Sequence, residues 1–176
     1  MILGDIVDMR TDAIVTAAHS DLKPAPGISQ AVFDAADTER LIEACRKIGR
    51  CRLGHAVVTP SCGLPSRYII HVAGPGWYSG QKAERMLFAN CYLHALQKAS
   101  ACHCRSVALP LMFSGAYHLP RAQALYIVCQ TVAYFEQAHP ELDITLVLYK
   151  DSIYRLALKV RANVEQRMQT QSGLQR

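Results

Sequence analysis

Short apolar runs rich in β-branched residues alternate along this chain with longer stretches of helical periodicity. The runs typical of strands are residues 12–18 (DAIVTAA), 55–60 (HAVVTP), 67–73 (RYIIHVA), 106–112 (SVALPLM) and 143–149 (DITLVLY). A strand without a polar face needs cover on both of its sides, which a sheet between two layers of helices provides. The alternation therefore predicts a three-layer α/β/α sandwich around a mixed, largely parallel sheet.

The helical stretches lie between these runs, as such a sandwich requires. Apolar residues recur at three- and four-residue steps from Ile28 to Ala35 and then from Leu41 to Cys45. Further helices are expected at residues 81–100, 120–139 and 151 to about 168. In the first of these, Leu87, Cys91 and Ala95 are four residues apart and share one face. No internal repeat or low-complexity block interrupts the pattern, which indicates a single domain.

Length and cysteine usage limit the class of protein. A chain of 176 residues is enough for one well-buried domain and short for two. No apolar run reaches the length of a membrane helix, and the start, MILGDIVDMR, lacks the pattern of a secretory signal. We therefore expect a cytoplasmic protein without a membrane partner. Seven cysteines, an odd number, then favour reduced thiols. Cys102-His103-Cys104 alternates too closely for the usual zinc spacing, so we expect no metal and no other cofactor.

The net charge of +5 favours anionic partners without naming one. Basic residues gather in residues 155–176, where the pattern is typical of a solvated helix face followed by a frayed end. We therefore divide the chain into a folded domain of residues 1–160 and a second part of residues 161–176. This second part comprises the end of the last helix and a flexible basic tail. No aromatic platform accompanies these charges, so little nucleic-acid binding is expected at physiological salt. The oligomeric state stays open.

Two loops are placed to hold a ligand. In α/β sheets, ligands bind beyond the carboxyl ends of the strands, where loops meet the N-termini of helices. One such loop lies within DAIVTAAHSDLKPAPGISQ, residues 12–30, and the other is FSGAYHLP, residues 113–120. The small residues of the second loop let backbone N–H groups converge on a phosphate. By itself this loop is more typical of an ordinary Ser-Gly turn, because such turns occur in many loops.

Five segments taken together resemble the macrodomain family, whose members bind ADP-ribose and related metabolites. The segments are GDIV (4–7), DAIVTAAHS (12–20), PGISQAVFDAA (26–36), CRLGHAVVTPSCGLPSRYIIHVAGPGW (51–77) and LPLMFSGAYHLP (109–120). The fourth combines a glycine-led strand, a Leu-Pro turn, and a strand that ends in Ile-His and then Gly-Pro-x-Trp. The resemblance runs from Leu3 to about Leu148 and implies the same three-layer fold.

The resemblance also implies a ligand scheme at the positions that match. Asp5 would accept the adenine amino group and Ile6 would donate a backbone N–H beside it, although an aspartate here is also typical of a turn or helix cap. The second loop would wrap the diphosphate and the distal ribose. The implied ligand-binding residues are Asp5, Ile6, Thr16, His19, Gly27, Ile28, Ser29, Ser114, Gly115, Ala116 and Tyr117.

The first loop departs from the family pattern. Members usually read Asn-Ala-Ala-Asn where this chain has Thr-Ala-Ala-His at 16–19, and consecutive glycines where it has Ala-Pro-Gly at 25–27. The aspartate of hydrolytic members is replaced by Ser29, which cannot act as a general base at neutral pH. Pro26 has no N–H to offer a phosphate. These changes predict weakened binding of the diphosphate.

His19 is the candidate catalytic residue, because an imidazole near the distal ribose can donate to a hydroxyl or relay a proton. The commoner alternative is a histidine that packs at a strand end and bonds only to backbone. Three functions stay open. The first is weakened binding of ADP-ribose or a derivative. The second is hydrolysis of O-acetyl-ADP-ribose or of ADP-ribosylated protein, and the third is a non-catalytic module for protein or RNA contact. The expected partner is ADP-ribose or an ADP-ribosylated protein.

Overall fold

A six-stranded sheet forms the centre of the computed structural model, which describes residues 1–115 and 118–173. The strands are β1 (Ile2–Leu3), β2 (Ala13–Ala18), β3 (Ala56–Pro60), β4 (Tyr68–Ala73), β5 (Ser106–Pro110) and β6 (Asp143–Leu148). Their order across the sheet is β1-β6-β5-β2-β4-β3. Neighbouring strands are parallel except β3 and β4, which pair antiparallel. The predicted mixed, largely parallel sheet is confirmed.

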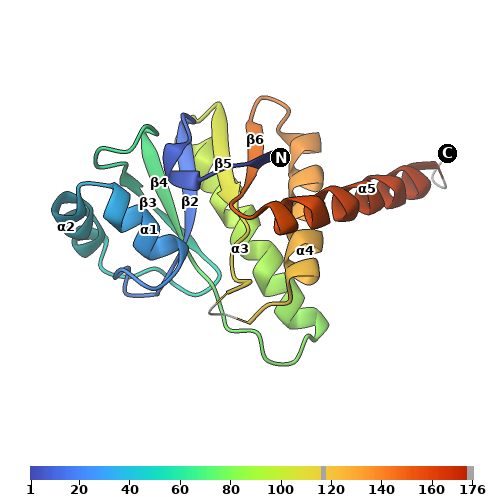
Figure 1. Cartoon of the computed structure of the whole chain (residues 1–176), viewed down its shortest axis with the longest axis horizontal. Coiled ribbons are helices and arrows are strands. Elements are labelled where there is room, and N and C mark those ends of the chain that lie inside the picture. The colour runs from blue at the N-terminus through green and yellow to red at the C-terminus, as the bar shows by residue number, and fades with distance from the viewer. Residues whose placement is uncertain (116–117, 174–176) are drawn as a thin grey trace.

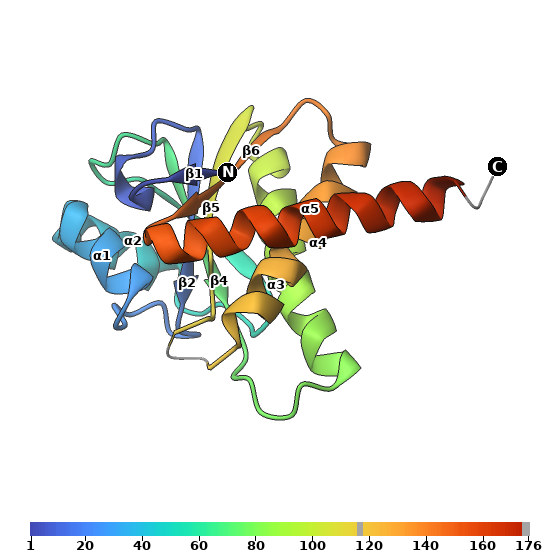
Figure 2. The same ribbon diagram turned by 45° about the vertical axis from the view of Figure 1, so that its right-hand side comes forward.

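Helices cover both faces of this sheet (Figures 1 and 2). In the described part of the chain they are η1 (Ile6–Asp8, a 3₁₀ turn), α1 (Ile28–Ala35), α2 (Thr38–Ile48), α3 (Lys82–Ala101), α4 (Arg121–Ala138) and α5 (Asp151–Gly173). The helices α1 and α2 pack on one face, and α3, α4 and α5 pack on the other. Alternate residues of β2 face opposite layers of helices. Ala13 and Val15 pack in the core on the side of α3, α4 and α5, whereas Ile14 and Ala18 pack on the side of α1 and α2.

The helical stretch expected from Ile28 to Cys45 consists of two helices. The chain leaves the helical conformation at Ala36, and the carboxylate of Asp37 then caps α2 by accepting the N–H of Arg40 at 3.2 Å. A side chain that satisfies a free helix N–H favours a new start at that point. Both helices bury one face in the same core cluster.

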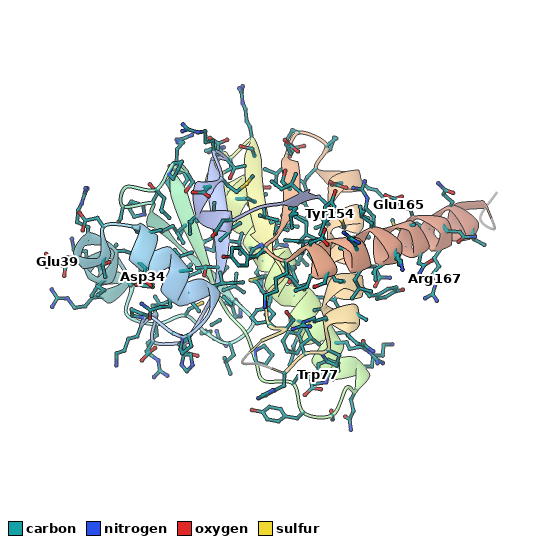
Figure 3. The ribbon with its side chains drawn as sticks, viewed as in Figure 1. Asp34, Glu39, Trp77, Tyr154, Glu165 and Arg167 are labelled. Atoms are coloured by element: carbon teal, nitrogen blue, oxygen red, sulfur yellow. The ribbon has the colours of Figure 1, made fainter. Side chains whose placement is uncertain are left out.

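Some boundaries also differ from those expected. The two-residue strand β1 has no strand signal in the sequence, and the strand expected at residues 106–112 ends at Pro110. Leu87 is 46% exposed, because the buried stripe of α3 runs through its neighbour Phe88 instead. The last helix continues to Gly173, and its end extends beyond α4 (Figure 1). Glu165 and Arg167 lie on this helix (Figure 3), and the guanidinium of Arg167 donates to the hydroxyl of Tyr126 in α4 at 3.4 Å. Among the described residues, no helix has the length and apolar character that a membrane crossing needs.

Asp12 joins the amino ends of three strands. Its Oδ2 accepts the N–H groups of Arg105 at 2.8 Å and Ser106 at 3.2 Å, just before and at the start of β5. Its backbone carbonyl accepts the N–H groups of Arg67 and Tyr68 at the start of β4. The N–H group of Arg105, followed by that of Ser106 and the guanidinium of Arg67, lowers the pKa of the Asp12 carboxyl. The residue therefore fixes the sheet at the edge opposite to the carboxyl ends of the parallel strands.

Candidate ligand-binding site

A cavity of about 450 Å³ lies where β1, β5 and β6 end. These strands are parallel neighbours, so their carboxyl ends meet at one edge of the sheet. The wall is completed by the segment before η1, the N-terminus of α1, the loop after β5 and the start of α5. The volume is within the range of small-molecule sites. The position and the size therefore both fit a ligand.

The cavity brings together residues from distant parts of the sequence. The sequence-predicted residues that line it are Asp5, Ile6, Gly27, Ile28 and Ser114. Tyr149 and Lys150, directly after β6, also line it and were missed. Their position in the sequence could have predicted this, because both follow a buried strand, where ligand-binding loops usually lie. Thr16, His19, Ser29 and Gly115 are not part of the lining.

Asp5 and Ile6 present an acceptor and a donor side by side. Oδ1 of Asp5 caps η1 by accepting the N–H of Val7 at 3.2 Å. Within residues 1–115 and 118–173, neither Oδ2 of Asp5 nor the N–H of Ile6 has a hydrogen-bond partner. An aromatic ring with an amino donor next to a ring-nitrogen acceptor matches this pair. Adenine has such an edge.

The N-terminus of α1 offers a place for an anion. Gly27 precedes it with φ +98°, a left-handed conformation that glycine adopts readily. In the described part of the protein, the N–H groups of Ile28 and Ser29 have no hydrogen-bond partner, as is usual for a first helical turn. Because Gly27 and Ile28 line the cavity, the positive end of the helix dipole lies at its wall.

The first loop is held by bonds within itself. The N–H of Ala25 donates to Oγ of Ser29 at 3.3 Å, and the carbonyl of Ala25 accepts the N–H of Gln30 at 2.9 Å. Ser29 is therefore buried and occupied in shaping the loop. Pro24 and Pro26 add no N–H groups. The loop keeps its form but leaves few donors for a phosphate.

Thr16 faces the layer formed by α1 and α2 and does not line the cavity. It is fully buried in β2, where its Oγ1 donates to the carbonyl of Ala17 at 3.3 Å. Its register partner is His71 in β4, which is also fully buried. Nε2 of His71 lies 2.9 Å from Oγ1 of Thr59, and burial lowers the pKa of His71 to about 4. These residues form a neutral polar cluster in the core.

His19 is exposed just after β2 and lies outside the cavity lining. Its backbone carbonyl accepts the N–H of Leu22 at 3.0 Å. No hydrogen bond joins its imidazole to the described residues. Lys23 is close by, and its ammonium pairs with Asp21 at 3.3 Å. The geometry therefore leaves the predicted catalytic role of His19 without a contact that supports it.

The second loop begins with a buried turn. Phe113 has φ +68° and is buried, whereas Ser114 is partly exposed at the cavity and Gly115 is exposed. The carbonyl of Phe113 accepts the N–H of Leu119 at 3.1 Å, which closes the loop. The predicted residues Ala116 and Tyr117 lie outside the described residues.

The seven cysteines are free thiols, and all but Cys102 are buried. Burial raises the pKa of the Cys45 thiol to about 11 and that of Cys91 to about 12, which keeps them protonated. Among the described residues, no group of three or more His, Cys, Asp or Glu side chains is placed to hold a metal ion.

Sequence comparison finds relatives along most of the chain. A family model described as Macro domain matches residues 15–128. A macro domain-containing protein of Lactiplantibacillus plantarum is 38% identical over 168 residues, which cover 93% of this chain and 97% of the relative. A protein of Escherichia fergusonii named O-acetyl-ADP-ribose deacetylase is 40% identical over 159 residues, which cover 87% of this chain and 89% of the relative.

Solved structures have the same fold. The Oceanobacillus iheyensis macrodomain with ADP superimposes with a TM-score of 0.88 at 29% identity, covering 94% of this chain and 90% of that one. The Trypanosoma brucei macrodomain in complex with ADP-ribose superimposes with a TM-score of 0.81 at 26% identity. That match covers 89% of this chain and 67% of the other.

Proposed function

Because the chain belongs to the macrodomain family, we propose that it binds ADP-ribose or a close derivative, with an affinity reduced by its altered first loop. The observation that carries this proposal is the cavity itself. It places the acceptor and donor of Asp5 and Ile6, the N-terminus of α1 and the second loop around one space. ADP and ADP-ribose, the ligands named for two structural neighbours, each have an adenine that fits Asp5 and Ile6 and a diphosphate that fits the N-terminus of α1.

The adenine would bind at Asp5 and Ile6. Its amino group donates to Oδ2 of Asp5, and its N1 accepts the N–H of Ile6. Guanine has a carbonyl and a protonated nitrogen at these positions, so both contacts would be lost. The exposed ring of Tyr149 lies at the same cavity and offers a surface for stacking.

The diphosphate would lie between the N-terminus of α1 and Ser114. The N–H groups of Ile28 and Ser29 are available there, but Pro26 has no N–H and that of Ala25 is already bonded to Ser29. A hydrogen bond to a charged group contributes about 1.5–3 kcal/mol. Each missing donor should therefore weaken binding by about 10- to 150-fold.

Titration calorimetry with ADP-ribose, ADP and GDP tests this proposal. We expect one site for ADP-ribose, weaker binding of ADP and no measurable binding of GDP. Pro26→Gly restores an N–H and should strengthen ADP-ribose binding by about 2- to 50-fold, after the cost of a more flexible loop. Pro24→Gly is the matched control, because it adds the same flexibility further from Gly27, which lines the cavity.

Equal effects of the two glycine variants would mean that the first loop does not hold the phosphates. The absence of any ADP-ribose binding would refute the proposal. It would favour the third function considered from the sequence, a non-catalytic module that contacts protein or RNA.

A second candidate function is hydrolysis, and one observation favours it. Relatives that are 38–40% identical carry the name O-acetyl-ADP-ribose deacetylase. In this chain Ser29 is buried and bonded, and His19 is not in the cavity lining. Loss of a general base costs about 10²–10⁴ in rate. We therefore expect turnover of O-acetyl-ADP-ribose close to the uncatalysed background.

His19→Ala decides between binding alone and catalysis by this residue. We expect it to leave both ADP-ribose affinity and the slow deacetylation unchanged. A variant that binds ADP-ribose normally but loses a robust wild-type deacetylation would show that His19 acts in catalysis. The protein would then be a hydrolase, and ADP-ribosylated protein would be the next substrate to test.

A further inference from the structure

Tyr92 joins the core of α3 to the base of the second ligand loop. The side chain is fully buried, and its hydroxyl accepts the N–H of Met112 at 2.8 Å. The same hydroxyl donates to the carbonyl of Pro110 at 3.5 Å. Pro110 ends β5, so the two bonds span the point where the strand becomes the loop. Leu111, between them, lines the cavity.

A cluster of aromatic rings holds the next residue of this loop. The ring of Phe113 lies 5.2 Å from that of Phe88 and 6.2 Å from that of Tyr92, measured between centroids. Trp77, which Figure 3 shows in the loop before α3, lies 5.8 Å from Phe88. Gly74 leaves the space for Phe113, because a Cβ added there would overlap its ring. Phe113 is thus fixed from two sides, directly before Ser114.

We propose that Tyr92 is a positioning residue for ligand binding, which sets the path of residues 111–115 along the cavity wall. It acts through the backbone bonds on either side of Leu111, with Phe113 as the second fixed point. The inference rests on the proposed function, in which the diphosphate lies beside Ser114 of this segment. It goes beyond that function in naming a residue that does not touch the ligand.

The hydroxyl matters here because its partners are buried backbone groups. In Tyr92→Phe the ring still fills the core, but the N–H of Met112 loses its acceptor and the carbonyl of Pro110 its donor. Buried groups without partners favour a shift of the segment that carries them. A shift of the loop moves Leu111 and Ser114, whereas Asp5 and Ile6 lie on another segment and stay in place.

The test compares two ligands in Tyr92→Phe. ADP-ribose reaches both ends of the proposed site, whereas AMP uses mainly the adenosine end. We expect ADP-ribose affinity to fall about three- to tenfold, the effect of one or two ordinary hydrogen bonds, with AMP affinity unchanged. Tyr134→Phe on α4 is the matched control, because its side chain is 69% exposed. A purely structural role for Tyr92 would lower both affinities equally, and that result or no change at all would overturn the inference.

Gly74→Ala perturbs the same loop from the other side. It displaces the ring of Phe113, so it should reproduce the selective loss of ADP-ribose affinity. Amide hydrogen exchange without ligand adds a readout that does not depend on the proposed function. In Tyr92→Phe, exchange should accelerate at residues 111–115 and stay unchanged at residues 5–8. Unchanged exchange at 111–115 would refute the positioning role, whereas wild-type protein that fails to bind ADP-ribose would refute only the proposed function.

Discussion

Asp5 offers a sharp test of the adenine site, because its two carboxylate oxygens have different surroundings. Oδ1 accepts the N–H of Val7 and caps η1, while Oδ2 has no partner among the described residues. Asp5→Asn keeps one oxygen for the cap and places an amino group where Oδ2 was. Asp5→Ala removes both interactions. The pair of variants therefore separates the cap from the contact with the ligand.

The expected magnitudes differ for folding and for binding. Removing the cap in Asp5→Ala should cost about 0.5–2 kcal/mol of unfolding free energy, and Asp5→Asn should cost little. Both variants lose a charge-assisted hydrogen bond to the adenine amino group. At about 1.5–3 kcal/mol, this loss corresponds to about 10- to 150-fold in the dissociation constant.

Calorimetry with ADP-ribose and with its hypoxanthine analogue is the assay. Hypoxanthine has a carbonyl in place of the amino group, so the wild-type protein should prefer adenine. In Asp5→Asn the new amino group can donate to that carbonyl, and the preference should narrow. Asp8→Asn is the control, since this exposed carboxylate on η1 does not line the cavity. If Asp5→Asn changes neither affinity nor base preference, adenine does not bind at Asp5.

Three further predictions concern stability and charge. Asp12→Ala should lower the free energy of unfolding by about 1.5–3 kcal/mol at pH 7 in a urea titration. Because the pKa of Asp12 is lowered in the folded protein, the difference from wild type should be complete above about pH 4 and shrink as pH falls further. Burial lowers the pKa of His71 to about 4, so the unfolded state takes up a proton first, and wild-type stability should fall by up to about 3 kcal/mol between pH 6.5 and 4. His71→Gln should flatten that slope, and an unchanged slope would assign it to other groups. RNA binding, followed by fluorescence anisotropy, should be weak and fall steeply with salt, because two basic side chains of α5 are paired with carboxylates on their own helix. Tight binding at high salt would contradict this expectation.

The layers of the fold could be predicted from the sequence because they depend on patterns between near neighbours. A run such as residues 144–148 (ITLVL) is mostly apolar and rich in β-branched residues, and it lies in a strand of the structure. The boundaries of helices and strands could not be predicted where a single side chain determines them. Asp37 starts a second helix between the apolar groups of residues 28–35 and 41–45, and its capping bond does not follow from the periodicity. β1 is too short to have a pattern, and it forms because β6 pairs with it.

The composition of the cavity was decided only by the tertiary structure. Asp5, Ser114 and Lys150 lie far apart in the sequence and meet because β1, β6 and β5 are neighbours in the sheet. The likeness to a family suggested Thr16 as well, but alternate residues of β2 face opposite layers, and Thr16 faces α1 and α2 in the core. The sequence by itself determined which segments are strands and helices, since periodicity is local. Which side chains share a cavity depends on the pairing of distant strands and on the face that each residue takes, and only packing decides these.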